Sequence, residues 1–356
     1  MSKENGMNYA PKGKPNSVCK EGEFIIAAIG LEHGHIYGMC NGFIEAGAQL
    51  KWVYDSDINK VLKFCEVYPQ AKAAQCEEEI LMDSSVHLIA CAAIPSDRCD
   101  IALRAMDAGK DYFADKAPVT TLEQLELVKA KVKETGRKYA VYFAERLHNE
   151  SSVFAGQLVE RGEIGRVLQV MGLGPHREGS ERSDWFYDKD KYGGILCDIG
   201  CHQIEQFLYF TGTKDAVIQN PRVANYNHKN YVKFEDFGDV SLVGDNGATG
   251  YFRVDWFTPD GLGTWGDGRL FILGTDGYIE LRKYIDVARD STTDHVYLVN
   301  KDGEQHIEVS GKVGFPFFGQ LILDLINRTE NSMTQEHAFK AVELCLVAQS
   351  EAKKIE

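Results

Sequence analysis

The order of elements in the first part of the chain limits most strongly what the chain can fold into. An apolar run at residues 23–29 ends at Gly30, a helical segment follows, and a second apolar run at 49–54 ends at Asp55. Short continuous apolar runs that alternate with helical segments are typical of strands buried on both faces of a parallel sheet. This order therefore predicts an α/β chain that begins with a doubly wound parallel sheet.

The same alternation continues to about residue 145. It predicts further strands at 86–93, 111–114 and 139–143, with helices at 60–67, 76–82, 97–108 and 121–135. We assign residues 23–145 to this first domain. Because 356 residues are many for one hydrophobic core, we expect a second domain to follow.

The pattern changes in the second half, where the strand-like runs become longer and are joined by turns. The expected strands are 167–173, 239–243, 250–256, 269–273, 278–282, 296–299 and 305–309. Asn246-Gly247, Asp276-Gly277 and Asp302-Gly303 are typical of hairpin turns. We expect residues 146–356 to form an α+β domain with an open-faced, mainly antiparallel sheet. Its last helix, 334–355, is expected to pack back on the first domain.

Composition and the N-terminal residues restrict location and partners. Residues 1–22 are polar and lack the apolar segment of a secretion signal, so we expect a flexible extension or, alternatively, an arm that grips a neighbouring subunit. The sequence contains no run of about 18 apolar residues, so we expect no transmembrane helix. Nine cysteines without a C-x-x-C motif indicate thiols in a reducing cytoplasm. The net charge of -14 argues against a nucleic-acid partner.

The loop after the first strand has the chemistry expected of a dinucleotide-binding turn. In such units the helix N-terminus holds the pyrophosphate, and an acid after the second strand binds the ribose hydroxyls. The loop departs from Gly-x-Gly-x-x-Gly because Glu32 and His35 stand at the second and third glycine positions. An ordinary strand–helix turn without a ligand is the alternative. Asp55 in the acidic position favours NAD over NADP, since a carboxylate repels the 2′-phosphate.

Two further places carry candidate chemistry. Asp198 and His202 lie four residues apart after Gly193-Gly194, so in a helix they project from one face and can act as an acid/base unit. A surface pair or a satisfied buried pair is the alternative. Lys116 follows a strand at the edge where open α/β sheets bind ligands, although an isolated loop lysine is more often solvated.

Several short motifs occur in the order in which one known family carries them. They are the loop at Gly30, Asp115-Lys116-Ala117-Pro118, Gly162-Glu163-Ile164-Gly165, the segment from Gly193 to His202, and Gly274-Thr275-Asp276-Gly277. From Phe24 to its C-terminus the chain therefore resembles the glucose-fructose oxidoreductase/inositol dehydrogenase (Gfo/Idh/MocA) family. The second motif departs from the family's Glu-Lys-Pro, and Ile94-Pro95-Ser96 stands where the family has Thr-Pro-Asn.

The resemblance implies a Rossmann domain that binds NAD, followed by a substrate-binding and oligomerisation domain. Carried over by position, the catalytic residues are Lys116, Asp198 and His202. The expected cofactor-binding residues are Gly30, Leu31, His33, Gly34, His35, Ile36, Asp55, Ala93, Ile94, Pro95 and Lys116. The expected substrate-binding residues are Lys116, Arg146, His176, Arg177, Trp185, Tyr187, Asp198, His202 and Trp265. We expect no metal, because the resemblance explains the Asp198–His202 pair without one.

The implied reaction is hydride transfer between nicotinamide and a ring hydroxyl of a sugar or glycoside, such as C3 of a pyranoside. His202 is expected to accept the hydroxyl proton while Lys116 stabilises the alkoxide. In the alternative assignment, Lys116 itself accepts the proton. Asp198 is expected to orient a substrate hydroxyl or the imidazole. Three alternatives remain for the whole protein. The substrate can be a cyclitol such as inositol, the protein can be a non-catalytic regulator that senses a sugar or nucleotide, or the cofactor can stay bound while two substrates are alternately oxidised and reduced. The expected partners are a small carbohydrate or polyol and further copies of the chain, as a dimer, tetramer or higher homo-oligomer.

Overall fold

The computed structural model describes residues 6–179 and 182–355, which form two compact units. The first unit contains Met7–Tyr142 and Pro316–Phe339, and the second contains Phe143–Phe315 together with Gly6 and the residues from Lys340 onward. The predicted division at residues 145–146 lies close to the one between Tyr142 and Phe143. Among the described residues, no helix has both the length and the apolar character that a membrane span requires.

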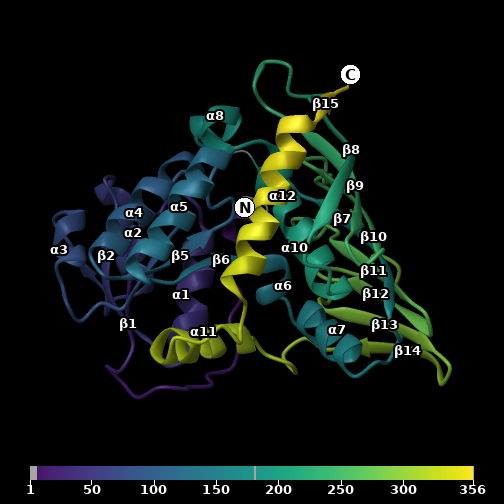
Figure 1. Cartoon of the computed structure of the whole chain (residues 1–356), viewed down its shortest axis with the longest axis horizontal. Helices are drawn as coiled ribbons and strands as arrows, with labels where there is room; N and C mark the ends of the chain where they lie inside the picture. Colours follow the sequence, from purple (N-terminus) through teal and green to yellow (C-terminus); the bar gives the residue numbers. More distant parts are fainter. Residues whose placement is uncertain (1–5, 180–181, 356) are drawn as a thin grey trace. The chain divides into compact units, whose positions relative to one another are not determined.

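The first unit is built around a six-stranded parallel sheet of order β3-β2-β1-β4-β5-β6 (Figure 1). The strands are β1 (Ile25–Ile29), β2 (Gln49–Tyr54), β3 (Lys72–Ala73), β4 (Leu88–Cys91), β5 (Asp111–Asp115) and β6 (Tyr139–Tyr142). Every residue of β4, β5 and β6 is buried, as expected for strands with helices on both faces. The predicted doubly wound α/β sheet is confirmed, and its strand order is the one that binds dinucleotides in other proteins.

Helices accompany this sheet, five of them in the order that the sequence predicts and a sixth, α11, from the part of the chain that we assigned to the second domain. They are α1 (His35–Glu45), α2 (Ile58–Val67), α3 (Glu77–Leu81), α4 (Arg98–Asp107), α5 (Leu122–Thr135) and α11 (Pro316–Asn327). The last of these comes from the far end of the chain and packs on α1, where the rings of Phe43 and Phe318 lie 5.3 Å apart. A Cβ at Gly42 would lie 2.4 Å from the Phe318 ring, so this glycine permits the close approach.

The segment before β1 lies along α1. The amide of Gly13 donates to both carboxylate oxygens of Glu45 at 2.9 Å, and the amides of Asn16 and Val18 donate to the carbonyls of Glu45 and Ala46. The sequence predicts a flexible extension here, whereas Gly13, Asn16 and Val18 bind the C-terminal end of α1.

The parallel sheet brings the expected cofactor residues to one edge. Because β1, β4 and β5 run in the same direction, their carboxyl ends lie side by side. Gly30 follows β1, Ala93 and Ile94 follow β4, and Lys116 follows β5. The sheet topology therefore positions the predicted nucleotide loop beside the predicted catalytic lysine.

The second unit contains a nine-stranded sheet of order β14-β13-β12-β11-β7-β10-β9-β8-β15. The strands are β7 (Val167–Pro175), β8 (Ala216–Ala224), β9 (Phe237–Gly244), β10 (Thr249–Asp255), β11 (Arg269–Gly274), β12 (Gly277–Arg282), β13 (His295–Asn300), β14 (Gly303–Glu308) and β15 (Lys353–Lys354). Neighbours are antiparallel except β7 with β10 and β8 with β15. The predicted mainly antiparallel sheet is confirmed. The sequence analysis missed β8, which contains Pro221 and lacks a clear alternation of apolar residues.

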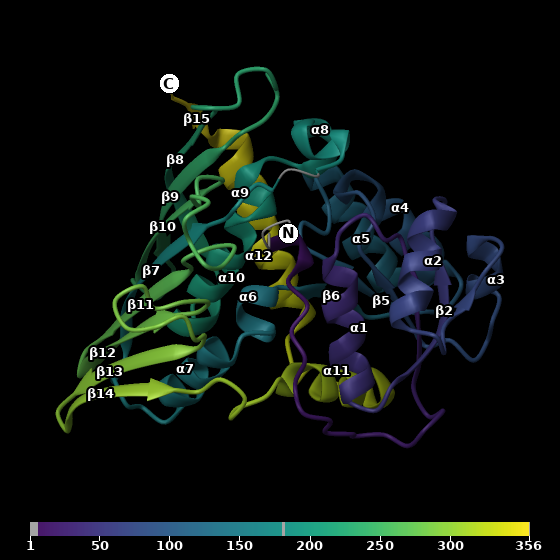
Figure 2. The same ribbon diagram turned by 180° about the vertical axis from the view of Figure 1, so that it is seen from behind.

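One face of this sheet is covered by helices and the other is open. Helices α7 (Glu150–Glu160) and α10 (Gly200–Thr211) pack on the covered face (Figure 2). Met171, Leu273 and Tyr278 are large apolar residues of the sheet that remain exposed. Buried and more exposed residues alternate along β10 and β11, as expected for a sheet packed on a single face.

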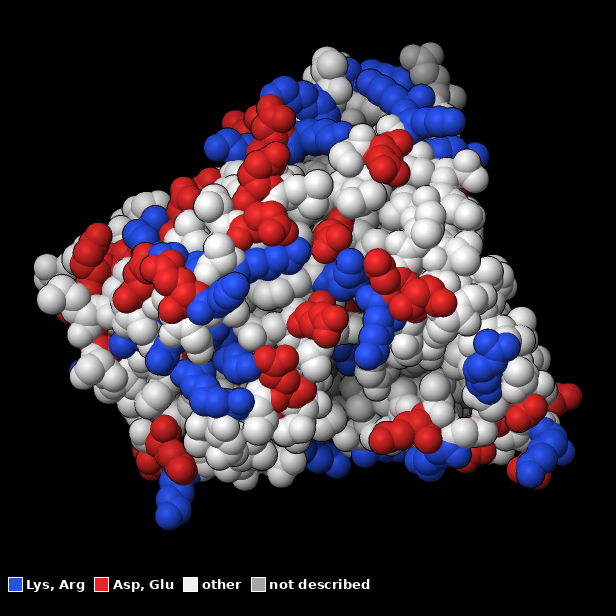
Figure 3. All heavy atoms as spheres, viewed as in Figure 1, with Lys and Arg blue, Asp and Glu red and all other residues white. Residues whose placement is uncertain are grey.

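The last helix, α12 (Gln335–Glu351), is divided between the two units. Its residues up to Phe339 group with the first unit, where the ring of Phe339 lies 5.8 Å from that of Tyr139, and its residues from Lys340 onward group with the second. Within the second unit, the side chain of Gln349 accepts a hydrogen bond from the amide of Leu196 and donates to Glu235. After α12 comes the short strand β15, where Lys353 and Lys354 are exposed. Figure 3 shows basic side chains gathered in this region, whereas acidic and basic side chains are mixed over the rest of the viewed face.

Candidate active site

The nucleotide loop of the first unit is held by Asp55. The amide of Leu31 donates to one oxygen of this carboxylate at 2.6 Å, and the amide of Asp57 donates to the other at 2.8 Å. Gly30 has a φ of 77°, and a Cβ there would lie 2.5 Å from the Cβ of Ala93. The turn therefore requires glycine at its first position. Each oxygen of Asp55 keeps a lone pair with which it can accept a further hydrogen bond.

Glu32, which stands at the second glycine position of the usual motif, points away to α2. Its carboxylate forms an ion pair with the ammonium group of Lys60. Lys60 neutralises the negative charge of Glu32, which explains how an acid can occupy a loop that is expected to bind phosphate. The sequence alone gave no account of this residue.

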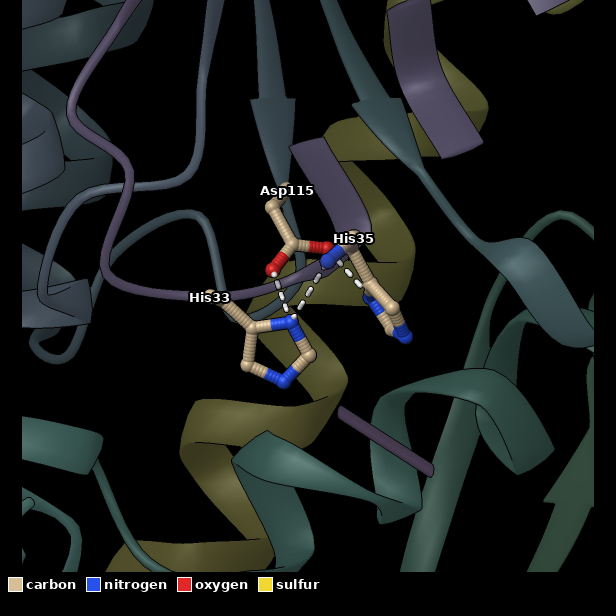
Figure 4. Close-up of side chains that lie close together, drawn as sticks. All are labelled: His33, His35 and Asp115. Carbon is tan, nitrogen blue, oxygen red and sulfur yellow. Dashed lines mark hydrogen bonds and ion pairs between the residues drawn. The ribbon is translucent and has the colours of Figure 1, made fainter. Parts of the chain in front are cut away.

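A buried charge network lies behind the same loop (Figure 4). His35, the first residue of α1, places Nδ1 2.8 Å from Oδ1 of Asp115, and His33 places Nδ1 3.4 Å from Oδ2. Burial by itself would raise the pKa of Asp115, but His35, Arg98 and Lys116 outweigh it and lower the pKa to about 2. Asp115 is therefore ionised at neutral pH and joins the nucleotide loop to the end of β5, directly before Lys116.

Arg98 is the residue of this network that the sequence analysis missed. It is fully buried, and its Nε donates to the carbonyl of Ala93 at 2.7 Å. Its Nη1 donates to the carbonyls of Asp115, Lys116 and Ala117 at 3.0, 2.5 and 2.9 Å, across a Lys116–Ala117 peptide bond that is cis. Its Nη2 donates to Asp115 Oδ2 at 3.2 Å. Nothing in the sequence marks an arginine at the start of a helix as buried, so only the structure could identify it.

The donor atoms of His33, His35 and Asp115 lie within 4.8 Å of one another, a spacing that could hold a metal ion. The guanidinium of Arg98 already neutralises the same carboxylate. A divalent cation would therefore stand close to a buried positive charge. We interpret the cluster as a hydrogen-bonded charge network.

The remaining expected cofactor residues lie around this edge. Gly34 is the N-cap of α1 and has no side-chain cap, and Pro95 begins a short 3-10 helix, η2 (Pro95–Asp97), after Ile94. Lys116 and Ala93 are buried. Ile36 is completely buried and belongs to the core of the first unit.

In the second unit, Asp198 and His202 lie on two consecutive helices rather than one. Helix α9 (Ile195–Asp198) ends at Asp198, and α10 begins at Gly200. The predicted continuous helix is wrong in this respect, because the amide of His202 bonds to the carbonyl of Ile199 three residues earlier and the ladder is interrupted there. Asp198 and His202 are nonetheless both buried, at 7% and 2% exposure.

Gly193 and Gly194 set the entry to α9. Both have positive φ, 88° and 93°. A Cβ at Gly194 would lie 2.2 Å from the side chain of Gln349, so the second glycine is required for space as well as for conformation. The glycine pair therefore allows α9 to begin against α12.

Asp198 has a cationic neighbour that the sequence analysis missed. The guanidinium of Arg182 lies 4.3 Å from the ring of Phe186 and 5.0 Å from that of Trp256. Burial lowers the pKa of Arg182 to about 10, and the charge of Asp198 opposes this shift. Arg182 therefore stays charged at neutral pH.

Glu145 and Lys283 form a second buried pair, next to α10. Oε2 of Glu145 lies 3.1 Å from Nζ of Lys283 and accepts a hydrogen bond from Gln203 Nε2 at 2.9 Å. Oε1 of Glu145 lies 3.9 Å from Nε2 of His176. Burial by itself would raise the pKa of Glu145, but Lys283, His202 and His176 outweigh it and lower the pKa to about 2. The sequence analysis did not select either member of this pair.

The structure brings together only part of the expected substrate set. The rings of His176 and Trp265 are in tilted contact with centroids 4.6 Å apart, and a Cβ at Gly6 would lie 2.8 Å from His176 and 3.1 Å from Trp265. Trp185 lies in the 3-10 helix η3 (Asp184–Tyr187), with its ring 6.3 Å from that of Phe186. His176 therefore faces Glu145 on one side and a tryptophan on another.

Three other expected substrate residues are engaged in contacts of their own. The guanidinium of Arg146 pairs with Glu205 at 2.5 Å and lies 4.0 Å from the ring of Tyr209. Arg177 donates to the carbonyls of Pro259 and Leu262, and so holds a surface loop. The hydroxyl of Tyr187 donates to Glu178 at 2.6 Å. The predicted role of Arg146, Arg177 and Tyr187 in substrate binding stays a prediction.

Comparison with protein families matches both units. Residues 27–143 match the oxidoreductase family model with an NAD-binding Rossmann fold, and residues 153–280 match the GFO/IDH/MocA C-terminal domain. A candidate oxidoreductase from Erwinia carotovora atroseptica SCRI1043 is 57% identical, with a TM-score of 0.91 over 94% of this chain and 100% of that one. Levoglucosan dehydrogenase in complex with NADH and L-sorbose shares the fold, with a TM-score of 0.73 and 17% identity over 92% of this chain and 95% of that one.

Two curated relatives are dehydrogenases. The scyllo-inositol 2-dehydrogenase (NAD(+)) of Bacillus subtilis (strain 168) is 26% identical over 207 residues, 56% of this chain and 56% of the relative. The D-xylose dehydrogenase of Paenarthrobacter nicotinovorans is 27% identical over 212 residues, 57% of this chain and 52% of the relative. The chain thus matches about half the length of each.

Proposed function

Because this chain belongs to the GFO/IDH/MocA oxidoreductase family, we propose that it is an NAD-dependent dehydrogenase of a ring hydroxyl in a sugar or glycoside. The observation that carries the proposal is the set of three buried polar residues at the two predicted sites. Lys116 follows β5 at the cofactor edge of the first unit, and Asp198 and His202 lie at the junction of α9 and α10 in the second. Buried ionisable groups of this kind are common at catalytic sites.

The loop of the first unit fits a dinucleotide. Glycine is required at residue 30, and α1 begins without a capping side chain at Gly34, which leaves the start of the helix suited to a pyrophosphate. Asp55 would accept the ribose hydroxyls, and its charge would repel the 2′-phosphate of NADP, so NAD is the proposed cofactor. When bound, the nicotinamide exchanges a hydride with the substrate carbon.

Side chains of the protein would accept the substrate proton and stabilise the charge that its loss leaves behind. Neutral His202 would accept the proton of the substrate hydroxyl, and the ammonium of Lys116 would stabilise negative charge on that oxygen. Asp198 would orient a neighbouring hydroxyl of the substrate, and its charge opposes the lowering of the pKa of Arg182 by burial. Lys116 as proton acceptor is the alternative assignment, and the pH dependence of the two variants His202→Ala and Lys116→Met distinguishes them.

A cyclitol is the second candidate substrate, because one curated relative is a scyllo-inositol dehydrogenase. Sugar rings and cyclitols both present an apolar face and several hydroxyls, and aromatic side chains pack on such faces. The adjacent rings of His176 and Trp265 in the second unit are suited to either substrate ring. The present geometry therefore supports a polyhydroxylated ring more strongly than a particular sugar.

The experiment is an assay of the purified protein with NAD or NADP and a panel of pyranosides, free aldoses and inositols, followed by the absorbance of reduced cofactor. We expect reduction of NAD with at least one ring substrate. A sugar that binds without any cofactor reduction would instead support a sensing regulator. Mass spectrometry of the protein as purified tests whether a nucleotide stays bound between turnovers.

We further propose a cytoplasmic homo-oligomer. All nine cysteines are thiols in the structure, as expected in a reducing compartment. The exposed apolar residues Met171, Leu273 and Tyr278 lie on the open side of the nine-stranded sheet, and apolar surface of this kind is commonly covered by another copy. Analytical ultracentrifugation gives the oligomeric state.

A further inference from the structure

We propose that residues 7–12 form a strap along α1 that is one wall of the nucleotide site, and that this strap slows the release of the cofactor. Asn8 is the residue of the strap that would bind the phosphate groups. The inference rests on the proposed function, because it assumes that the nucleotide loop binds NAD. It gives a role to the chain before β1, for which the sequence predicts a flexible extension or an arm that grips a neighbouring subunit.

The strap is anchored at the C-terminal end of α1 by the residues that follow it. The amide of Gly13 donates to both carboxylate oxygens of Glu45 at 2.9 Å, and the amide of Asn16 donates to the carbonyl of Glu45 at 2.8 Å. Within the strap, the carbonyl of Pro11 accepts a hydrogen bond from Nδ2 of Asn41 on α1 at 3.4 Å. The donors at the anchor are backbone groups, so the anchor does not depend on the side chains of residues 13–16.

Two glycines on one side of α1 receive the other end of the strap (Figure 2). Gly34 and Gly38 are four residues apart, so they lie one turn apart on the same face. A Cβ at Gly34 would lie 2.4 Å from the carbonyl oxygen of Met7. A Cβ at Gly38 would lie 3.4 Å from the carbonyl oxygen of Tyr9 and from the Cα of Ala10. The strap therefore occupies the space that these glycines leave.

Gly34 serves the strap through its small size. Its φ of -62° and ψ of -11° are open to any residue, in contrast to the positive φ of Gly30. Glycine at residue 34 is thus required for space and not for backbone conformation. The short distance to the Met7 carbonyl explains this requirement without any ligand.

The strap leaves the end of the helix axis open. In a helix the Cα–Cβ bond points outward from the side, whereas the N–H groups of the first turn point along the axis. The Met7 carbonyl lies in the Cβ direction of Gly34, so it stands beside the first turn of α1. An anion at the start of the helix would be a neighbour of the strap and would not compete with it.

Asn8 is the strap side chain that lies beside Gly34. Its Oδ1 is 3.1 Å from the position that a Cβ at Gly34 would take, and the residue is exposed and so accessible to a ligand. Because this unit matches an NAD-binding family model, a pyrophosphate is expected at the start of α1. The side-chain amide of asparagine carries two N–H donors, and a phosphate oxygen is a strong acceptor. Asn8 would therefore donate to the pyrophosphate when NAD is bound.

A brace that only stabilises α1 is the competing interpretation. It predicts that loosening the strap lowers stability and leaves the affinity and release of the cofactor unchanged. A wall of the site instead predicts reciprocal effects, in which the strap retards release and bound NAD holds the strap in place. Cleavage by trypsin after Lys12, which is exposed, reports on the second effect, and we expect NAD to slow it.

The test measures NAD affinity by calorimetry and NADH release by stopped-flow fluorescence in the full-length protein and its variants. In Asn8→Ala we expect the affinity for NAD to fall by about tenfold, because a hydrogen bond to a charged phosphate is lost. Removal of residues 1–11, which keeps the anchor at Gly13, should speed NADH release by about tenfold or more. Asn327→Ala is the matched control, since it removes an exposed asparagine at the end of α11 in the same unit, and it should change neither quantity.

Gly34→Ala tests whether the strap itself is responsible. The added methyl group should displace Met7 and speed NADH release in the full-length protein, but it should add little in the protein without residues 1–11, where no strap is left to displace. An equal effect in both proteins would show that the methyl group acts on the nucleotide directly, and would count against the strap.

NADH release that is unchanged or slower in the shortened protein would overturn the inference; slower release would show that residues 1–11 compete with the nucleotide. A shortened protein that forms smaller oligomers with unchanged release would point instead to an arm that grips a neighbouring subunit. If the shortened protein does not fold, Asn8→Ala decides alone, and an unchanged affinity rejects the strap.

The proposed function and the strap fail in different ways. If the variants release NADH faster while the unmodified protein oxidises no ring substrate, the strap stands and the proposed reaction fails. If a sugar is oxidised while release is the same in all variants, the reaction stands and the strap fails. A protein that binds neither NAD nor NADP contradicts both.

Discussion

Nη1 of Arg98 lies 2.5 Å from the carbonyl oxygen of Lys116, the lysine that the sequence marks as catalytic. The same guanidinium binds the carbonyl of Ala93 and the carboxylate of Asp115. One buried side chain thus fixes the backbone on which Lys116 stands and the loop that follows β4. The orientation of Lys116 depends on a residue that no motif singles out.

Replacement of Arg98 by Lys should therefore lower both stability and activity. Lysine keeps the charge but cannot reproduce the planar fork that binds several oxygens together. We expect a loss of about 2 kcal/mol or more in the free energy of unfolding, measured by urea denaturation, together with a fall in kcat/KM. Arg104 on the same helix is the control, because it is exposed and pairs with Glu77 on the surface. Equal losses in Arg98→Lys and Arg104→Lys would contradict the assignment.

Acid should destabilise the first unit through Asp115. Its pKa is lowered to about 2 in the folded protein, by charges that outweigh the opposing effect of burial, and an unfolded aspartate titrates near 4. A lowered carboxyl pKa contributes stability above the unfolded value and loses it as pH falls between about 4 and 2. The contribution at pH 7 is about 2–3 kcal/mol. Asp115→Asn should lose stability at pH 7 and show a flatter acid dependence in this window; an unchanged acid profile would refute the assignment.

The choice of cofactor should depend on Asp55. In Asp55→Asn the charge that repels the 2′-phosphate is removed, while the remaining amide oxygen can still accept the hydrogen bond from Leu31. We expect the ratio of kcat/KM for NAD to that for NADP to fall by about tenfold or more, a change of about 1.4 kcal/mol. Asp57→Asn is the control because Asp57 caps α2. A ratio that stays constant in Asp55→Asn would remove Asp55 from cofactor selection.

His202 should be required for turnover rather than for folding. His202→Ala is expected to lower kcat by about 10²–10⁴-fold, since a positioned acid/base contributes that much. Thermal unfolding of the variant shows whether it is folded, and His306→Ala on β14 provides a histidine control away from α10. Undiminished turnover in a folded His202→Ala protein would transfer the acid/base role to Lys116.

The sequence was sufficient for the architecture because the signals involved are local and repeated. Apolar runs of strand length between helical segments give the parallel sheet, and hairpin turns between alternating strands give the antiparallel one. The same reasoning failed where a local signal was weak. It missed β8, and it placed Asp198 and His202 in one helix because Ile199 carries no breaker signal.

The site divides in a similar way. Short motifs with fixed spacing marked Lys116, Asp198 and His202 in the sequence, because glycine pairs and strand ends are recognisable in a linear chain. Arg98, Glu145, Lys283 and Arg182 could not be found that way, since each acts through contacts far along the chain, such as the 138 residues that separate Glu145 from Lys283. Burial turns an ordinary charged residue into a partner that sets the charge of another, and burial is decided only when the chain has folded.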